Sequence, residues 1–289
     1  MDLRAVFMGL AFALMWSSAF ATARIIVADV PPFTTLTLRF AISGAFAVGI
    51  ALALGQSWRL TRAQAAAVVI FGLCQNALYL GLNFVALQWI PASVAAIIAS
   101  AMPLIVAALG WAFRGERVSP LGLAGLCAGF GGVILIMGSR VQGGVEPAGV
   151  ALCVMAAFAL AVATLAVKGA SSGGNLLMIV GLQMLVGSAI LAPIAALNET
   201  LPTHVGLPAM LAFAYQICVP GLMATLLWFA LVTRIGAVRA ATFHFLNPFF
   251  GVAVAAALLG ERVTALDFLG VAIVMAGIYA VQIARSRVT

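Results

Sequence analysis

Charged residues are scarce in this sequence. Asp, Glu, Lys and Arg make up 7% of its 289 residues, whereas a soluble domain carries about 25%, because its surface must be covered with polar groups. Hydrophobic residues account for 65% of the chain, and the mean hydropathy is +1.23. These values exclude a soluble domain and predict an all-α membrane protein that crosses the bilayer several times.

The apolar segments also lack groups for catalysis or metal binding. The 7 acidic residues lie in loops or at the ends of apolar runs, and His244 is the one deep side chain that titrates near neutral pH when free in water. The motifs HExxH and GxSxG are missing, and the 4 cysteines stand one per apolar run without CxxC spacing. We therefore predict no enzyme activity, no metal, no cofactor and no disulfide framework.

The 14 Lys and Arg residues are scattered singly or in pairs. Nucleic-acid binding needs a clustered basic stripe, so we predict no nucleic-acid partner. The expected partners are a small-molecule substrate and the lipid bilayer, with no obligatory protein partner and a monomer as the functional unit.

Ten apolar runs are long enough to span a bilayer, which takes about 20 residues. Short breaks with turn residues or charge separate most of them, so neighbouring helices are expected to be antiparallel. The predicted spans are 5–27, 33–54, 64–87, 92–113, 119–138, 147–168, 174–197, 207–232, 237–258 and 265–284.

Half of the chain repeats the other half. Residues 82–136 align with 227–281 without a gap, each residue lying 145 positions after its counterpart, and 16 of the 55 pairs are identical. Pro103 meets Pro248, and the sequence Gly-Glu-Arg-Val at 115–118 meets the same sequence at 260–263. We predict two repeats of five helices each, over 1–140 and 146–285. Because five is odd, the second repeat enters the membrane inverted relative to the first.

The basic residues predict the orientation. If the N-terminus is cytoplasmic, ten basic residues lie inside and four outside, as the positive-inside rule requires. Both termini are then cytoplasmic. The four outer residues are Arg24, Arg39, Arg140 and Arg262.

Several short motifs occur along the chain: Trp16-Ser17-Ser18-Ala19-Phe20, Leu38-Arg39-Phe40, the segment 79–87, Pro103, Gly115-Glu116-Arg117, Phe229-Ala230-Leu231, Asn247-Pro248 and Gly260-Glu261-Arg262. In these motifs the sequence resembles the ten-helix EamA-type members of the drug/metabolite transporter superfamily. The resemblance implies a central cavity lined by helices one, three, four, six, eight and nine, with helices five and ten peripheral.

Polar side chains at depth are candidates for the cavity, because they are costly when they face lipid. Asn76, Tyr79 and Asn83 follow helical spacing in the third span and predict one polar face. Interhelical hydrogen bonding is the alternative role for this face. Trp228 corresponds to Asn83 in the second repeat, so aromatic and amide groups would meet in the cavity and suit a partly apolar, zwitterionic ligand. The remaining predicted cavity residues are Trp16, Ser17, His244 and Asn247.

Prolines within spans predict the moving parts. Pro103 and Pro248 would interrupt helices four and nine at matched positions, and such pairs indicate a transporter's site. Pro220-Gly221 interrupts helix eight and has no counterpart in helix three, so the halves are expected to bend differently there. Arg24 and Arg39 have two possible roles. Their side chains either anchor the helices by reaching the membrane interface, or line an outer gate or vestibule that attracts carboxylates.

Together these patterns predict a multi-pass transporter of the bacterial inner membrane that exports small amphiphilic metabolites by alternating access. Amino acids are the predicted substrates, and the resemblance adds aromatic ones. The alternative is a multidrug or other metabolite permease of the same fold, with proton coupling through His244 as one means of driving it.

Overall fold

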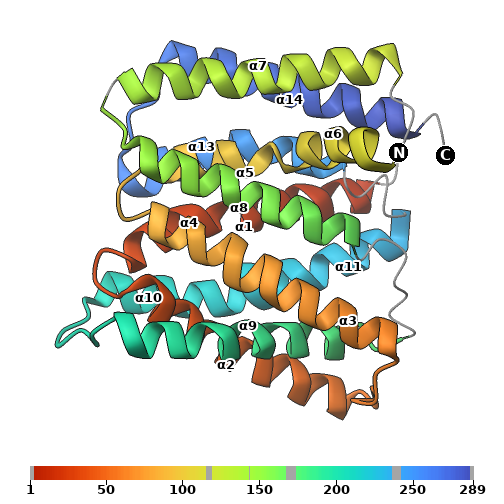
Figure 1. The fold of residues 1–289 in the computed structure, drawn as a ribbon, viewed down its shortest axis with the longest axis vertical. Helices are drawn as coiled ribbons and strands as arrows, with labels where there is room; N and C mark the ends of the chain where they lie inside the picture. Colours follow the sequence, from red (N-terminus) through yellow and green to blue (C-terminus); the bar gives the residue numbers. More distant parts are fainter. Residues whose placement is uncertain (1–2, 115–118, 143, 167–173, 236–241, 287–289) are drawn as a thin grey trace.

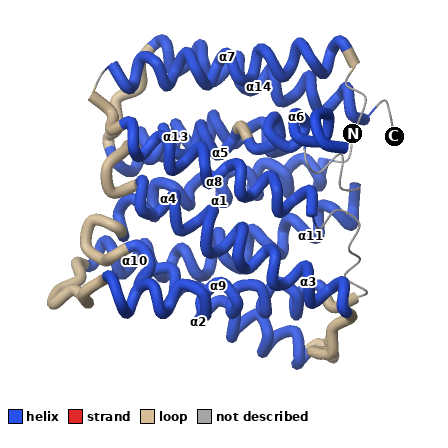
Figure 2. Tube along the Cα trace, in the orientation of Figure 1, coloured by secondary structure: helices blue, strands red, loops and turns tan. Residues whose placement is uncertain are grey.

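The computed structural model describes residues 3–114, 119–142, 144–166, 174–235 and 242–286. Within these ranges every regular element is a helix and no strand occurs (Figure 2). The helices of the first repeat are α1 (Leu3–Ile26), α2 (Pro32–Ala53), α3–η1–α4 (Arg62–Phe71, Gly72–Leu80, Gly81–Ala86), α5–α6 (Ala92–Ser100, Met102–Arg114) and α7 (Pro120–Gln142). Those of the second are α8 (Pro147–Ala166), α9 (Leu176–Asn198), α10–η2–α11 (Leu207–Gln216, Ile217–Met223, Ala224–Ile235), η3–α13 (Thr242–Leu246, Asn247–Leu259) and α14 (Ala265–Ser286).

The predicted ten-helix fold is confirmed. In the described part of the chain, six segments are long and apolar enough to cross a membrane, and four apolar helices are shorter. The helices run side by side, and both chain ends lie at the same end of the bundle (Figure 1). The second repeat begins with α8 at the opposite end, which shows that the repeats are inverted (Figure 1).

Equivalent helices pair with each other across the two repeats. α7 packs along α14 at one edge of the bundle, and α2 packs along α9 at the other (Figure 1). The first pair is close because glycines remove the side chains between the backbones: a Cβ on Gly277 would lie 2.5 Å from the backbone nitrogen of Gly129. Small residues permit this approach in membranes, where dispersion rather than the hydrophobic effect holds helices together.

Helices three and eight each contain a π-helical turn. η1 begins at Gly72 and η2 begins at Ile217, which are the same position in the two repeats. The halves are expected to bend differently here, because Pro220-Gly221 has no counterpart in helix three; the structure shows that both helices are interrupted at the same position, helix three without a proline. Asn76 in η1 donates its side-chain amide to the carbonyl of Gln183 on α9 (2.8 Å), and a Cβ on Gly72 would lie 3.0 Å from that same carbonyl. Contact with α9 thus accompanies the π turn in helix three.

The proline interruptions in helices four and nine also match. α5 ends at Ser100 and α6 begins at Met102, while η3 ends at Leu246 and α13 begins at Asn247. Residue 101 corresponds to residue 246 in the repeat, and each proline is the second residue of the helix that follows. A proline is tolerated there because its missing N–H would have no partner within the helix. The side chain of Pro103 is not among those described, whereas Pro248 is buried.

Several helix N-termini are capped by the other repeat. The Glu199 carboxylate accepts from the N–H groups of Phe33 (2.8 Å) and Thr34 (2.6 Å) at the start of α2. Glu261 accepts from the N–H groups of Ala92 (2.6 Å) and Ser93 (3.1 Å) and from the Ser93 hydroxyl at the start of α5. A carboxylate at this place satisfies free N–H groups and complements the helix dipole.

The amide of Gln56 at the end of helix two plays the same part at the opposite end of the bundle. Its Oε1 accepts from the N–H of Met178 at the start of α9 (3.0 Å). Met178 is the repeat counterpart of Phe33, so these contacts follow the internal symmetry. Glu116, the counterpart of Glu261, lies outside the described residues.

Candidate functional site

Two adjoining chambers lie between the repeats. The first, here called the arginine chamber, has ≈ 490 Å³ of space that no atom fills, and the second, the histidine chamber, has ≈ 420 Å³; both figures include space open to solvent. The arginine chamber is lined by Trp16, Ala19, Phe20, Ala23, Arg39, Gln75, Tyr79, Leu80, Asn83, Phe84, Leu87 and Pro220. The histidine chamber is lined by Trp16, Ser17, Phe20, Tyr79, Ala96, Ala99, Ser100, Met102, Leu160, His244 and Asn247.

An aromatic wall belongs to both chambers. Trp16, Phe20 and Tyr79 line each of them, and Tyr79 is only 3% exposed. Trp16 and Phe20 are one turn apart on α1, so they present one face, while Tyr79 approaches from η1. A ligand in either chamber therefore meets the same three rings.

Both repeats contribute to the chambers. The first supplies most of the lining, and the second supplies Leu160 from α8, Pro220 from η2, His244 from η3 and Asn247 from α13. Helices one, three, four, six, eight and nine all take part, as the family resemblance implies. Helix two takes part as well, through Arg39. Among the described residues, none from α7 or α14 lines either chamber.

Polar groups of the histidine chamber are partly satisfied by each other. The Asn247 side-chain amide donates to His244 Nδ1 (3.1 Å), and the Ser17 hydroxyl donates to the Asn247 carbonyl (3.3 Å). Asn247 Oδ1 is buried without a hydrogen-bond partner. The chamber therefore has one hydrogen-bond acceptor without a partner, Asn247 Oδ1. The bonds that Asn247 makes with His244 and Ser17 hold this residue in place.

Aromatic rings pack against His244 and against one another beside the histidine chamber. His244 contacts Phe12 edge-on, with ring centroids 5.2 Å apart, and lies 5.0 Å from Trp228. Phe12 also contacts Trp16 (5.7 Å) and Trp228 (4.8 Å). Trp228 therefore lies behind His244 and supports the imidazole rather than lining a chamber.

The arginine chamber contains a buried cation. Arg39 is 6% exposed, its guanidinium carbon lies 5.6 Å from the centroid of the Phe40 ring, and its Nη1 has no hydrogen-bond partner. Of the two roles that the sequence allowed, an anchor reaching the interface is wrong for Arg39, because the side chain is enclosed by protein.

Arg24 has a different environment from Arg39. Its Nη1 donates to the carbonyl of Leu87, whose side chain lines the arginine chamber. This bond joins the end of α1 to the end of helix three beside the chamber.

Asn83 offers an acceptor to the same chamber. Its Nδ2 donates to the Tyr79 carbonyl (2.7 Å), and its Oδ1 is buried without a hydrogen-bond partner. The bonded NH₂ fixes the amide plane, so the free oxygen is held in place.

Asn76 does not join Tyr79 and Asn83 at the chambers. It is 1% exposed and bonded to α9, which is the interhelical role that was the alternative for this face. The π turn explains the separation. Residues three apart lie about 60° from each other around an α-helix, but about 115° apart in a π-helix with its i→i+5 bonds. Asn76 consequently faces α9 while Tyr79 faces the chambers.

The interrupted segments lie beside the chambers. Pro220 lines the arginine chamber, and a Cβ on Gly221 would lie 2.9 Å from the carbonyl of Gln216. Phe20, Ser100, Met102 and Leu160 were not predicted as lining residues. The one-turn spacing from Trp16 could have indicated Phe20, but nothing in the sequence indicates the others.

Ten helices in two inverted repeats around a mixed aromatic and polar cavity are an architecture that many membrane transporters share. The chain belongs to the EamA-like transporter family, whose model matches residues 3–138 and 147–283.

Named relatives cover nearly the whole chain. Protein PecM of Dickeya dadantii (strain 3937) is 25% identical over 279 residues, which cover 93% of this chain and 89% of that protein. The probable amino-acid metabolite efflux pump of Escherichia coli (strain K12) is 27% identical over 291 residues, which cover 94% and 92%.

A partial match and a solved structure complete the comparison. The aromatic amino acid exporter YddG of Ancylobacter novellus is 32% identical over 140 residues, 48% of each chain. One crystal structure matches with a TM-score of 0.71 and 22% identity, covering 100% of this chain and 99% of the other, and so shares the fold.

Proposed function

We propose that this protein exports small amphiphilic metabolites, with amino acids including aromatic ones as substrates, across the bacterial inner membrane. The observation that carries the proposal is the pair of chambers, in which three rings stand beside buried polar atoms without partners. Rings fit an apolar side chain, and the free polar atoms fit a head group. The names of the Escherichia coli and Ancylobacter novellus relatives support amino acids as the substrate class.

Alternating access is the proposed mechanism. The helical interruptions lie at matched positions in inverted repeats and border the chambers. In such a design, each repeat can adopt the conformation of the other, so that the cavity opens to one side at a time. Since one chain supplies both repeats, the proposed unit is a monomer.

The proposed transport is driven by the substrate gradient. Among the described residues, no Asp or Glu lines either chamber, and His244 is the one lining residue that titrates near neutral pH in water. Its Nδ1 accepts a hydrogen bond from Asn247 and its ring is packed between aromatic side chains. These contacts suit a neutral imidazole.

Counterflow in proteoliposomes tests the function. Vesicles loaded with unlabelled phenylalanine are expected to accumulate labelled phenylalanine, at equal rates with and without an imposed pH gradient. The counterflow rate of the His244→Ala protein is likewise expected to be the same with and without the pH gradient. Strong acceleration by the gradient that His244→Ala abolishes would contradict gradient-driven transport. Exchange of cationic drugs but of no amino acid would contradict the substrate class.

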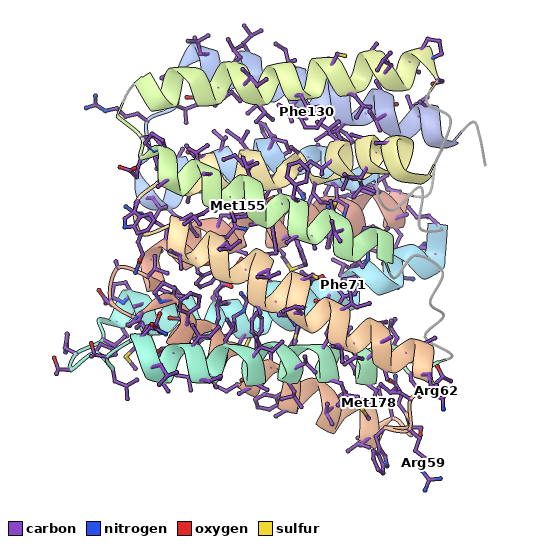
Figure 3. All side chains as sticks on the ribbon, viewed as in Figure 1. Arg59, Arg62, Phe71, Phe130, Met155 and Met178 are labelled. Atoms are coloured by element: carbon purple, nitrogen blue, oxygen red, sulfur yellow. The ribbon has the colours of Figure 1, made fainter. Side chains whose placement is uncertain are left out.

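The proposed orientation places both termini in the cytoplasm. Arg59 and Arg62 lie at the end of the bundle that holds both chain ends (Figure 3), and basic loops face the cytoplasm. A reporter fused after Gly144, in the loop at the other end, is expected to show periplasmic activity, and one fused after Arg59 cytoplasmic activity. The reverse result would invert the assignment.

A further inference from the structure

Arg39 is a cation placed where a membrane protein rarely leaves one unpaired. It lies seven residues into α2, about 10 Å along the axis from Pro32. The side chain is 6% exposed and Nη1 has no hydrogen-bond partner. A guanidinium in this position is costly unless an anion or a set of acceptors meets it, and such residues mark substrate pathways.

The protein supplies no carboxylate to Arg39 in the part of the chain that the structure describes. The acidic groups near this end of the bundle are engaged elsewhere. Glu199 and Glu261 cap helices α2 and α5, Asp29 accepts from the N–H of Gly206 (2.9 Å), and Asp267 accepts from the N–H of Thr264 (2.7 Å). Glu146 is exposed and accepts from the N–H of Ala148 (3.4 Å) at the start of α8. Among the described residues Arg39 therefore has no counter-charge, and an anionic ligand could supply one.

Arg39 borders a cavity. Arg39 lines the arginine chamber together with Asn83 and the aromatic wall. Guanidinium groups donate only, and they match the two oxygens of a carboxylate in a fork geometry. The Asn83 oxygen accepts only, and its position is fixed by the bond from Nδ2 to the Tyr79 carbonyl. An ammonium group, which donates only, suits that oxygen.

We propose that the arginine chamber is the head-group subsite for an α-amino acid. Arg39 binds the α-carboxylate, Asn83 Oδ1 accepts from the α-ammonium, and the side chain of the substrate packs on Trp16, Phe20 and Tyr79. This inference rests on the proposed function and adds a selection rule. Zwitterions bind, whereas amines without a carboxylate do not, because the buried guanidinium repels them.

Ligand-induced thermal shifts of the purified full-length protein test the subsite with three matched probes. Phenylalanine has both head groups, phenethylamine lacks the carboxylate and 3-phenylpropionate lacks the ammonium. We expect phenylalanine to raise the melting temperature most, 3-phenylpropionate less and phenethylamine not at all. Equal shifts for phenylalanine and phenethylamine would overturn the role of Arg39.

Two variants separate binding from folding. Arg39→Met should abolish the shift with phenylalanine and lower phenylalanine counterflow at least about tenfold, while the ligand-free melting temperature stays equal or rises, since a buried unpaired charge is removed. Arg39→Lys should retain part of both. Arg59→Met is the matched control, because it removes the same charge from an exposed position at the other end of the bundle. A wild-type shift retained in Arg39→Met would overturn the subsite.

The role of Asn83 is tested on its own. Asn83→Leu should lower the shift with phenylalanine towards that with 3-phenylpropionate and leave the latter unchanged. Equal loss for both ligands would overturn ammonium recognition. If the wild type exchanges no amino acid but binds 3-phenylpropionate in an Arg39-dependent way, the proposed function fails while the carboxylate subsite stands.

Discussion

Replacing Tyr79 with alanine is expected to lower the initial rate of phenylalanine counterflow about tenfold to a hundredfold. The ring forms part of the wall of both chambers and is 3% exposed. A substrate in either chamber would lose this contact, and one buried aromatic contact is worth about 1.5–3 kcal/mol. The backbone carbonyl of residue 79 remains, so Asn83 keeps its partner. The measurement is the counterflow rate per amount of correctly folded protein.

Tyr279→Ala is the matched control for this prediction. Tyr279 is 49% exposed on α14, stands 5.6 Å from the Phe245 ring and lines neither chamber. The Tyr279→Ala substitution removes the same ring from a peripheral helix. It should leave the counterflow rate within about twofold of the wild-type rate, as expected for a surface substitution. If both variants transport equally well, the Tyr79 ring is packing only.

Glu261→Ala is expected to lower the free energy of unfolding by about 2–3 kcal/mol. The carboxylate accepts from two backbone N–H groups and one hydroxyl at the start of α5. Its loss leaves these donors without a partner at a partly buried helix end. Each missing cap or hydrogen bond there costs about 1–2 kcal/mol, and new hydrogen bonds to water recover part of this free energy. Glu261→Gln should recover part of the loss, because an amide oxygen still accepts. Thermal denaturation in detergent measures both.

Glu146→Ala is the control for charge and helix position. Glu146 is exposed, and its carboxylate accepts a long bond, 3.4 Å, from the N–H of Ala148 at the start of α8. It should change stability by less than about 0.5 kcal/mol. A Glu261→Ala protein as stable as Glu146→Ala would show that the contact between repeats adds nothing to stability.

The fold could be predicted because its determinants are local or repeated. Span length and hydropathy gave helix bounds that agree with the structure to within a few residues in nearly every case, and the constant 145-residue spacing predicted the matched interruptions around Pro103 and Pro248. Both signals can be read along the chain without knowledge of which helices are neighbours.

The site could be predicted only in part, because it depends on the faces that helices turn to each other. The spacing of Asn76 and Tyr79 implies a shared face only in an α-helix, and the π turn that separates them carries no proline in helix three. Arg39 follows Thr35 and precedes Ser43 at four-residue spacing on α2, but this short polar stripe does not show which neighbouring helices it faces. The caps formed by Glu199 and Glu261 join residues more than 160 positions apart.

The exchange of caps between the repeats limits their autonomy. The starts of α2 and α5 find their acceptors in Glu199 and Glu261, and the start of α9 finds one in Gln56. A single repeat inserted by itself would leave these N–H groups unsatisfied near the membrane surface, where each costs free energy. The two repeats therefore complete each other's helices, and each repeat is expected to be less stable by itself than within the ten-helix bundle.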